Sequence, residues 1–245
     1  MPRMRADLLL VAKGLAESRA KAQAAIEAGG VRADGALVAK ASELLKLSAQ
    51  LEINRPHPWV SRGGVKLSRA LESFAIDPGG RVCLDIGAST GGFTQVLLAA
   101  GAARVYAVDV GHGQLHHKLR DDPRVVALER TDARALTSAQ IPKPPSLIVC
   151  DVSFIGAAKA LSAPLALAAE RADLIVLIKP QFEAGPKAGR EGVLEESVAR
   201  AAAQRAIAAL DGQQAFALVR AIDSPIRGGE GNLEMLALFR RALQT

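Results

Sequence analysis

The sequence contains few cysteines, and this scarcity limits what the protein can be. Only two of its 245 residues are cysteine, Cys83 and Cys150, and each lies inside an apolar run. Two thiols cannot form a metal cluster by themselves, and unpaired buried thiols are typical of a reducing compartment. The sequence therefore predicts a cytoplasmic protein without disulfide bonds.

Long apolar runs and aromatic residues are also scarce. No run approaches the ~20 apolar residues that a membrane helix needs, so no membrane partner is expected. Lys13 follows the short apolar stretch near the amino terminus, which argues against a secretory signal. Aromatic residues make up 3% of the chain and hydrophobic residues 49%, so Ala, Leu, Val and Ile must form the core of one or two domains.

Positive charge is concentrated in the first quarter of the chain. The net charge is +6, and residues 1–66 hold eleven Lys or Arg against six Asp or Glu. This asymmetry indicates a polyanion partner for the amino-terminal segment. A merely solvated basic surface would give the same count.

Residues 1–53 are predicted to form a small helical domain with a hairpin. Asp7 and Ser18 are each expected to cap a short helix, the second of which ends at Gly29-Gly30. Asp34-Gly35 lies within an alternating segment, which is typical of a hairpin turn, and residues 51–53 suit a further strand. Residues 54–60 contain two prolines and are interpreted as a linker, with Trp59 packing on the second domain.

Residues 61–245 alternate between strand and helix patterns. A helix is expected from Ser61 to Phe74, with Lys66 and Arg69 off its apolar face. The first strands are continuous apolar runs, as buried parallel strands are, and the last two are joined too closely to run parallel. The sequence predicts a Rossmann-like α/β fold with seven mainly parallel strands and one reversed strand near the edge. The expected strands are 81–86, 104–109, 124–128, 146–151, 173–178, 214–222 and 232–239, with helices near 92–100, 156–169 and 195–210.

The turn after the first of these strands is the most specific feature of the chain. Open α/β sheets bind nucleotide ligands at this position, but a dinucleotide site has glycine where Ser89 stands. Asp85 would repel a pyrophosphate and attract the sulfonium and amino groups of S-adenosylmethionine. The turn therefore favours this cofactor over NAD, and an ordinary strand–turn–helix is the alternative. The residues expected to bind it are Asp85, Gly87, Ala88, Ser89, Thr90, Gly91, Gly92, Phe93 and Thr94.

Further carboxylates follow the next two strands. Asp109 comes about 20 residues after the glycine turn, where an acid commonly holds ribose hydroxyls. Capping of the following turn is the less favoured interpretation of Asp109. Asp132 would face the adenine amino group or, equally well, cap a helix that begins at Ala133.

Three charged residues are expected to meet at the carboxyl edge of the sheet. Asp151 ends the fourth strand, Lys179 ends the fifth, and Glu234 lies near the start of the reversed last strand. The start of a reversed strand lies at the same edge as the ends of its parallel neighbours. A lysine at the end of a buried strand needs a partner, because an unpaired buried cation is costly. A salt bridge to Asp151 would provide one, and the same pair could also take part in catalysis. Lys66 would complete the set.

Other chemistries fit less well. Enzymes that methylate adenine amino groups have Pro-Pro and an aromatic residue after the fourth strand, where this chain has Val152-Ser153-Phe154. Cys150 should point away from the site if Asp151 points into it, so a cysteine nucleophile is not expected. His112, His116 and His117 have no Cys or Glu partner nearby in the sequence. They are interpreted as loop surface, and no metal is predicted.

Two sets of motifs resemble known families. Ser18-Arg19-Xaa-Lys21-Ala22, with Ile26, Gly29, Val31, Asp34-Gly35 and Lys40, resembles the alpha-L RNA-binding module of a small-subunit ribosomal protein and of pseudouridine synthases. The segments 60–67, 85–94, 151–154, 178–183 and 231–234 resemble the TlyA (haemolysin A) family of ribosomal RNA 2′-O-methyltransferases. The resemblance covers essentially the whole chain. It implies an RNA-binding domain at 1–53, a linker at 54–60 and an FtsJ-like methyltransferase domain at 61–245.

The resemblance also implies chemistry. S-adenosylmethionine is the expected donor, a cytidine ribose in ribosomal RNA the acceptor, and ribosomal RNA or subunits the partners of what we expect to be a monomer. The catalytic set of the family, Lys-Asp-Lys-Glu, falls on Lys66, Asp151, Lys179 and Glu234. The residues expected to contact RNA are Arg3, Arg5, Arg19, Lys21, Arg32, Lys40 and Arg62.

Two other functions are compatible with parts of the sequence. A non-catalytic RNA-binding or ribosome-assembly protein could retain a methyltransferase fold, but the intact catalytic set argues against it. A pore-forming haemolysin would need membrane-active amphipathic or long apolar segments, and none is found.

Overall fold

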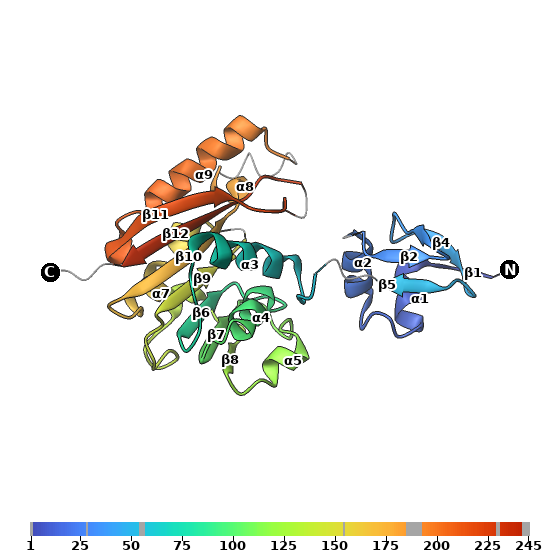
Figure 1. Cartoon of the computed structure of the whole chain (residues 1–245), viewed down its shortest axis with the longest axis horizontal. Coiled ribbons are helices and arrows are strands. Elements are labelled where there is room, and N and C mark those ends of the chain that lie inside the picture. The colour runs from blue at the N-terminus through green and yellow to red at the C-terminus, as the bar shows by residue number, and fades with distance from the viewer. Residues whose placement is uncertain are drawn as a thin grey trace. The chain divides into compact units, whose positions relative to one another are not determined.

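The computed structural model divides the chain into two compact units, Met1–Pro58 and Trp59–Thr245 (Figure 1). The structure describes residues 2–27, 29–53, 57–153, 155–184, 193–228 and 231–241. Phe154 and residues 54–56 of the proposed linker lie outside these ranges. The predicted domain bounds therefore stay predictions, although Trp59 itself falls within the second unit.

The first unit contains two short helices and small antiparallel sheets around its own core. Leu9, Leu10, Ala22, Ile26 and Val31 are buried in that core. The expected hairpin is present, and its turn has positive φ at both Asp34 and Gly35, as a tight hairpin requires. The elements are β1 (Arg3–Arg5), α1 (Ala6–Ala12), α2 (Arg19–Glu27), β2 (Val31–Ala33), β3 (Ala36–Leu37), β4 (Leu44–Lys46) and β5 (Leu51–Ile53).

Two expectations for this unit have different outcomes. The backbone N–H of Lys21 donates to Ser18 Oγ at 3.3 Å, so Ser18 caps α2 as predicted. Asp7 does not cap α1, because Arg5 holds that position and the Asp7 side chain is buried within the first turn. The pairing of β1 with β4 was not predicted, since three-residue strands are too short to show an alternating pattern.

The second unit is the predicted Rossmann-like fold. Its seven strands lie in the order β11-β12-β10-β9-β6-β7-β8, running from top to bottom of the domain in Figure 1. All neighbours pair in parallel except β12, which runs antiparallel to both β10 and β11. The strands are β6 (Val82–Ile86), β7 (Arg104–Val108), β8 (Val125–Leu128), β9 (Leu147–Cys150), β10 (Ala172–Ile178), β11 (Phe216–Asp223) and β12 (Met235–Arg241).

Helices cover both faces of this sheet. Because side chains alternate across a strand, Cys150 packs in one core cluster and Val149 in the other. Cys150 is thus fully buried, as expected, and burial raises its pKa, which excludes it as a nucleophile. The helices are α3 (Arg62–Phe74), α4 (Gly92–Ala99), α5 (His117–Arg120), α6 (Ala157–Ala160), α7 (Ser162–Ala166), α8 (Pro180–Glu183) and α9 (Glu196–Leu210).

Two helix predictions need correction. The helix expected at 156–169 is two short helices, α6 and α7, because Pro164 has no N–H to donate to the carbonyl of Ala160. Lys66 does not share the exposed side of α3 with Arg69; it is only 7% exposed. Trp59 packs against α3 as expected, since a Cβ built at Gly64 would overlap its side chain.

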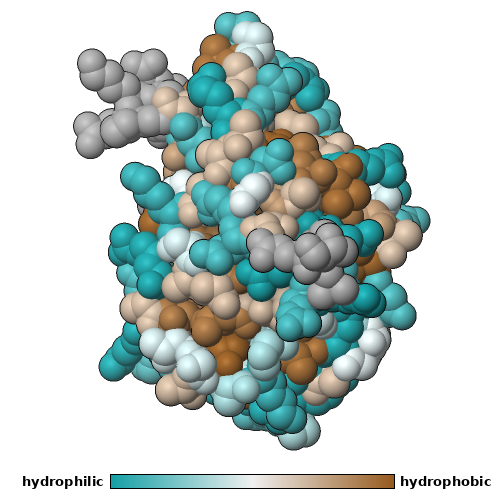
Figure 2. All heavy atoms as spheres, turned by 90° about the vertical axis from the view of Figure 1, so that its left-hand side faces the viewer, coloured by the Kyte–Doolittle hydropathy of each residue, from teal (hydrophilic) through white to brown (hydrophobic). Residues whose placement is uncertain are grey.

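The amino ends of the parallel strands lie opposite the edge where ligands of this fold bind. Figure 2 shows this face, where hydrophobic side chains form separate patches among hydrophilic ones. In the described part of the chain, none of the helices combines the length and the apolar composition that crossing a bilayer requires.

Substituting Gly87 should reveal how tightly the sheet edge is packed. Gly87 and Gly212 both have φ near +80°, but a Cβ at Gly87 would overlap the backbone of Asp151, whereas nothing lies near a Cβ at Gly212. Gly212→Ala should therefore cost only the ~1–2 kcal/mol of left-handed backbone strain. Gly87→Ala should lower the free energy of unfolding by about 2–5 kcal/mol, because overpacking adds to the strain. Urea unfolding measures both, and equal losses would contradict the packing explanation.

Candidate active site

The glycine turn connects β6 to α4 through three residues with left-handed backbone. Gly87, Ser89 and Gly91 have φ of 82°, 46° and 95°. The backbone N–H groups of Gly87 and Ala88 both donate to the carbonyl of Val108, which fixes the turn to β7. Ser89 thus adopts a conformation that glycine takes at far lower cost.

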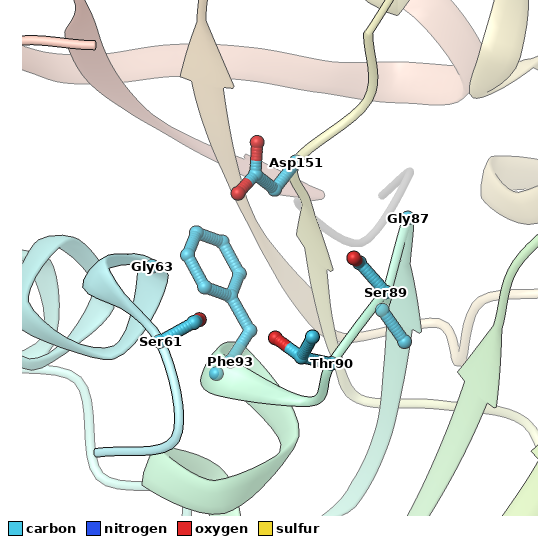
Figure 3. A pocket seen from close by; sticks show the side chains of 9 residues that line it. Ser61, Gly63, Gly87, Ser89, Thr90, Phe93 and Asp151 are labelled. Atoms are coloured by element: carbon cyan, nitrogen blue, oxygen red, sulfur yellow. The ribbon is translucent and has the colours of Figure 1, made fainter. Parts of the chain in front are cut away.

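The turn forms one wall of a hollow of about 130 Å³ at the carboxyl edge of the sheet. Asp151 and the ring of Phe93 face this hollow together with Ser89 and Thr90 (Figure 3). The start of α3 forms the other wall and packs so closely on α4 that a Cβ at Gly92 would overlap Ser61 Oγ. The remaining lining residues are Ser61, Gly63, Gly87, Ala88 and Gly92.

Asp85 is fully buried in the strand that leads into the turn. Thr94 Oγ1 donates to Asp85 Oδ2 at 2.6 Å, while Oδ1 has no hydrogen-bond partner among the described residues. Burial, the dominant cause, raises the pKa of this carboxyl to about 7. A buried carboxylate oxygen without a partner suits a ligand that brings positive charge. The chemistry of the site therefore fits S-adenosylmethionine.

The other two acids of the predicted cofactor set have backbone partners. Asp109 accepts hydrogen bonds from the N–H groups of Ser89 and Gly111 at 2.8 and 2.7 Å, so it both braces the glycine turn and caps the following one. Asp132 caps a short 3₁₀ helix, Ala133–Ala135, which is the simpler of its two interpretations. The guanidinium of Arg134 beside it lowers the pKa of Asp132 to about 2. Ribose and adenine contacts stay predictions.

Asp151 and Lys179 form the salt bridge that the sequence suggested. Lys179 Nζ lies 2.6 Å from Asp151 Oδ1 and also donates to Ser153 Oγ at 2.9 Å. Both charged side chains are largely buried, at 21% and 13% exposed. The ammonium group is therefore held from two sides.

Lys66 and Glu234 form a second ion pair, which the sequence did not indicate. Lys66 is 7% and Glu234 4% exposed, so both charges are removed from water. Removing one partner of such a pair leaves an uncompensated buried charge, which is strongly destabilising. The pair therefore fixes α3 to the strand start that carries Glu234.

The sheet register brings the two ion pairs to one edge. Ile178 of β10 pairs with Met235 of β12, and Lys179 and Glu234 are the residues next to this pair at the carboxyl edge. Asp151 follows directly on β9, the other neighbour of β10. Two ammonium groups and two carboxylates are thus gathered beside the glycine turn, with their charges balanced.

Sequence reasoning missed two contacts that stabilise this edge. The first is the hydrogen bond from Lys179 Nζ to Ser153 Oγ, since sequence reasoning treated Ser153 only as part of a motif. Ser153 lies two residues after Asp151, and in an extended chain two such side chains point to the same side. Glu183 accepts a hydrogen bond from the backbone N–H of Ala157 at 2.9 Å and so joins the segments that follow β9 and β10. The acid four residues after Lys179 gave no sequence signal for this role.

The histidine interpretation needs correction in two details. A glutamate does lie close to His112, since Glu129 Oε2 is 3.4 Å from its Nδ1. His117 begins α5 rather than lying in a loop, and His116 caps that helix by accepting from the N–H of Lys118. The prediction of no metal stays a prediction.

The residues predicted to bind RNA differ in their surroundings. Arg5 and Arg19 contact buried Asp7, and Lys21 pairs with Glu17. The guanidinium of Arg62 donates to the backbone carbonyls of Arg227 and Gly228, in the connection between β11 and β12. Arg3, Arg32 and Lys40 are exposed.

The sheet order, the single reversed strand and the glycine turn define the class as a Rossmann-like methyltransferase. A family model described as FtsJ-like methyltransferase matches residues 59–241, and one described as S4 domain matches residues 4–51. The chain belongs to the TlyA family of FtsJ-like methyltransferases. It is thus an enzyme of methyl transfer that carries an S4 RNA-binding module.

Its relatives cover nearly the full chain. A Mycobacterium tuberculosis protein named 16S/23S rRNA (cytidine-2′-O)-methyltransferase TlyA is 46% identical, over 97% of this chain and 90% of its own length. Hemolysin A of Brachyspira hyodysenteriae is 42% identical over 96% of this chain and 99% of that protein. The solved structure of a hemolysin-named protein from Streptococcus thermophilus is 36% identical, covers 99% of this chain and 90% of its own, and aligns with a TM-score of 0.76.

Replacing Asp85 with asparagine should remove a pH-dependent loss of stability. The pKa of Asp85 is raised from 3.8 to about 7 in the folded protein, so the folded state binds the extra proton between these values. Stability must then fall as pH rises through this window, by as much as about 4 kcal/mol at about 1.4 kcal/mol per pKa unit. Urea unfolding of both proteins from about pH 4 to about pH 9 should show this relative fall in the unsubstituted protein. Parallel pH curves would contradict it.

Proposed function

We propose that this protein transfers a methyl group from S-adenosylmethionine to the 2′-hydroxyl of a cytidine ribose in ribosomal RNA. The name of the Mycobacterium tuberculosis relative supports the acceptor. The observation that carries the proposal is the pair of buried ion pairs, Lys66–Glu234 and Asp151–Lys179, at the edge where this fold binds its donor. These four residues form the proposed catalytic set.

The glycine turn and its neighbouring acids would hold the donor. When bound, S-adenosylmethionine supplies a methyl group on a sulfonium, the electrophile for an activated hydroxyl. Asp85 would offer its free oxygen to the positive charge of the donor, and Phe93 would form an apolar wall. Asp109 retains lone pairs for ribose hydroxyls after accepting its two backbone hydrogen bonds, and we assign Asp132 to the adenine side.

Lys179 is the proposed base that accepts the 2′-hydroxyl proton. Its nitrogen donates a hydrogen bond to Ser153 Oγ and lies 2.6 Å from Asp151 Oδ1 in an ion pair. Once deprotonated, this nitrogen would carry a lone pair that can accept the proton of a substrate hydroxyl. The proposal requires that Lys179 reacts as the neutral amine, because only that form has a lone pair to accept the proton.

Asp151 and Glu234 would keep the two amines oriented and the site close to electrical neutrality. After proton transfer, the positive charge on Lys179 lies beside Asp151, so little charge reorganisation is required. Lys66, in its ion pair with Glu234, would stabilise the developing alkoxide. Catalysis then depends mainly on position and fixed charge.

The S4 module would position the RNA through its phosphates. Phosphate contacts fix the orientation of the nucleic acid without reading its sequence, so the choice of cytidine is assigned to the methyltransferase unit. A ribosomal RNA substrate implies ribosomal subunits as partners and the cytoplasm as the place of action. We take the monomer as the working form.

The Lys179→Ala variant tests the proposed base. Methyl transfer from tritiated S-adenosylmethionine to ribosomal RNA should fall by at least about 100-fold, the usual contribution of a general base. Binding of the donor, followed by calorimetry, should stay within a few-fold. Lys159→Ala, an exposed lysine of α6, is the control and should retain full activity. Unchanged methyl transfer in Lys179→Ala would refute the assignment.

Ser153 variants test whether the direction of the amine matters. Ser153→Ala removes one of two groups that orient Lys179, so kcat should fall by about tenfold, as loss of one charge-assisted hydrogen bond implies. KM for RNA should not change, and Ser153→Thr should restore most of the rate because it keeps the hydroxyl. A rise in KM without a change in kcat would instead indicate a role for Ser153 in RNA binding.

A further inference from the structure

Asp7 is a buried carboxylate in a unit that the proposed function assigns to a polyanion. The residue is 0% exposed and accepts five hydrogen bonds. These come from Nε and Nη2 of Arg5, Nε of Arg19, the side-chain amide of Gln23 and the backbone N–H of Leu8. Both carboxylate oxygens are hydrogen-bonded. These contacts lower the pKa of Asp7, and the hydrogen bonds from Arg5 are the largest cause.

The two arginines around Asp7 remain available to solvent. Their side chains are 37% and 54% exposed. Among the described residues, both donate side-chain hydrogen bonds to Asp7 alone. Nη1 of Arg5 and both Nη atoms of Arg19 are thus free to donate to an external acceptor.

The geometry sets these two guanidinium groups side by side. Nη2 of Arg5 and Nε of Arg19 donate to the same oxygen, Oδ2 of Asp7, at 3.0 and 2.8 Å. Two guanidinium cations at this separation repel each other, and the buried negative charge between them offsets the repulsion. Because the carboxylate is inaccessible, an approaching anion meets only the cationic side of the cluster.

We infer that Asp7 is a positioning residue for RNA binding, which holds Arg5 and Arg19 as a pre-oriented clamp for one backbone phosphate. A phosphate offers several oxygens to planar guanidinium donors, and fixed donors lose less side-chain entropy on binding. The inference rests on the proposed RNA substrate. Lys21 differs, because its exposed partner Glu17 holds it at the surface by a single contact.

The inference makes a prediction opposite in sign to simple charge counting. Asp7→Asn makes the unit one charge more positive, which by itself should tighten binding to a polyanion. Three side chains, Arg5, Arg19 and Gln23, donate to Oδ2 of Asp7. The asparagine amide is neutral and has only one accepting oxygen, so it should no longer hold Arg5 and Arg19 together. We expect the Kd for RNA to rise about tenfold, and the slope of log K against log salt to become shallower by about one phosphate contact.

The test is fluorescence anisotropy of a labelled RNA hairpin with the full-length protein at several salt concentrations. Glu52→Gln is the matched control, because it removes one negative charge from an exposed site of the same unit and should leave binding equal or slightly tighter. Circular dichroism and thermal unfolding check that Asp7→Asn is folded. A folded Asp7→Asn that binds RNA as tightly as the unsubstituted protein overturns the inference and leaves the proposed function intact.

A second variant decides the matter if Asp7→Asn does not fold. Arg19→Lys keeps the charge and can still pair with Asp7, but it lacks the planar donors for phosphate, so Kd should again rise several-fold. Arg69→Lys is the control, because Arg69 has the same 54% side-chain exposure and an exposed acidic partner, Glu72. Unchanged affinity in Arg19→Lys overturns the inference. Absence of salt-dependent RNA binding in the unsubstituted protein would overturn both the clamp and the proposed RNA substrate.

Discussion

The candidate site depends on the reversal of one strand, β12, within an otherwise parallel part of the sheet. A parallel β12 would begin at the opposite edge and carry Glu234 away from Asp151 and Lys179. Pairing of Ile178 with Met235 instead sets Glu234 next to Lys179. Lys66, on a helix that precedes the whole sheet in the chain, then finds a buried partner. Four residues separated by up to 168 positions thus form one neutral group.

Charge balance governs the buried acids of this protein. Asp7 and Asp173 each contact two arginines, and Glu234 contacts Lys66. Asp85 is the exception among the buried carboxylates that the structure describes, since Thr94 donates hydrogen bonds to it but no cation pairs with it. Removing a carboxylate from water without a neighbouring cation costs free energy. Asp85 lies in the strand that leads into the turn where a cationic donor is expected. The proposed binding of a cationic donor would account for this exception.

The sequence was sufficient to predict the strands because buried parallel strands are long apolar runs, and the short connection between the last two strands predicted that they run antiparallel. Asp151 and Lys179 could be paired because both end adjacent strands. Lys66 was harder to place, since helical spacing indicates only that a residue lies off the apolar stripe, not whether a distant carboxylate covers it. Asp7 was misassigned for a related reason. A capping residue and a buried acid look alike in sequence when the partners, Arg19 and Gln23, come from another helix.

The burial of both cysteines has a practical consequence. Burial raises the pKa of Cys83 to about 12 and that of Cys150 as well, so neither thiol is available to alkylating reagents in the native state. A cysteine introduced at an exposed position would be the only reactive thiol of the chain. The native protein is therefore a ready background for attaching a single spectroscopic probe to an introduced cysteine on either unit.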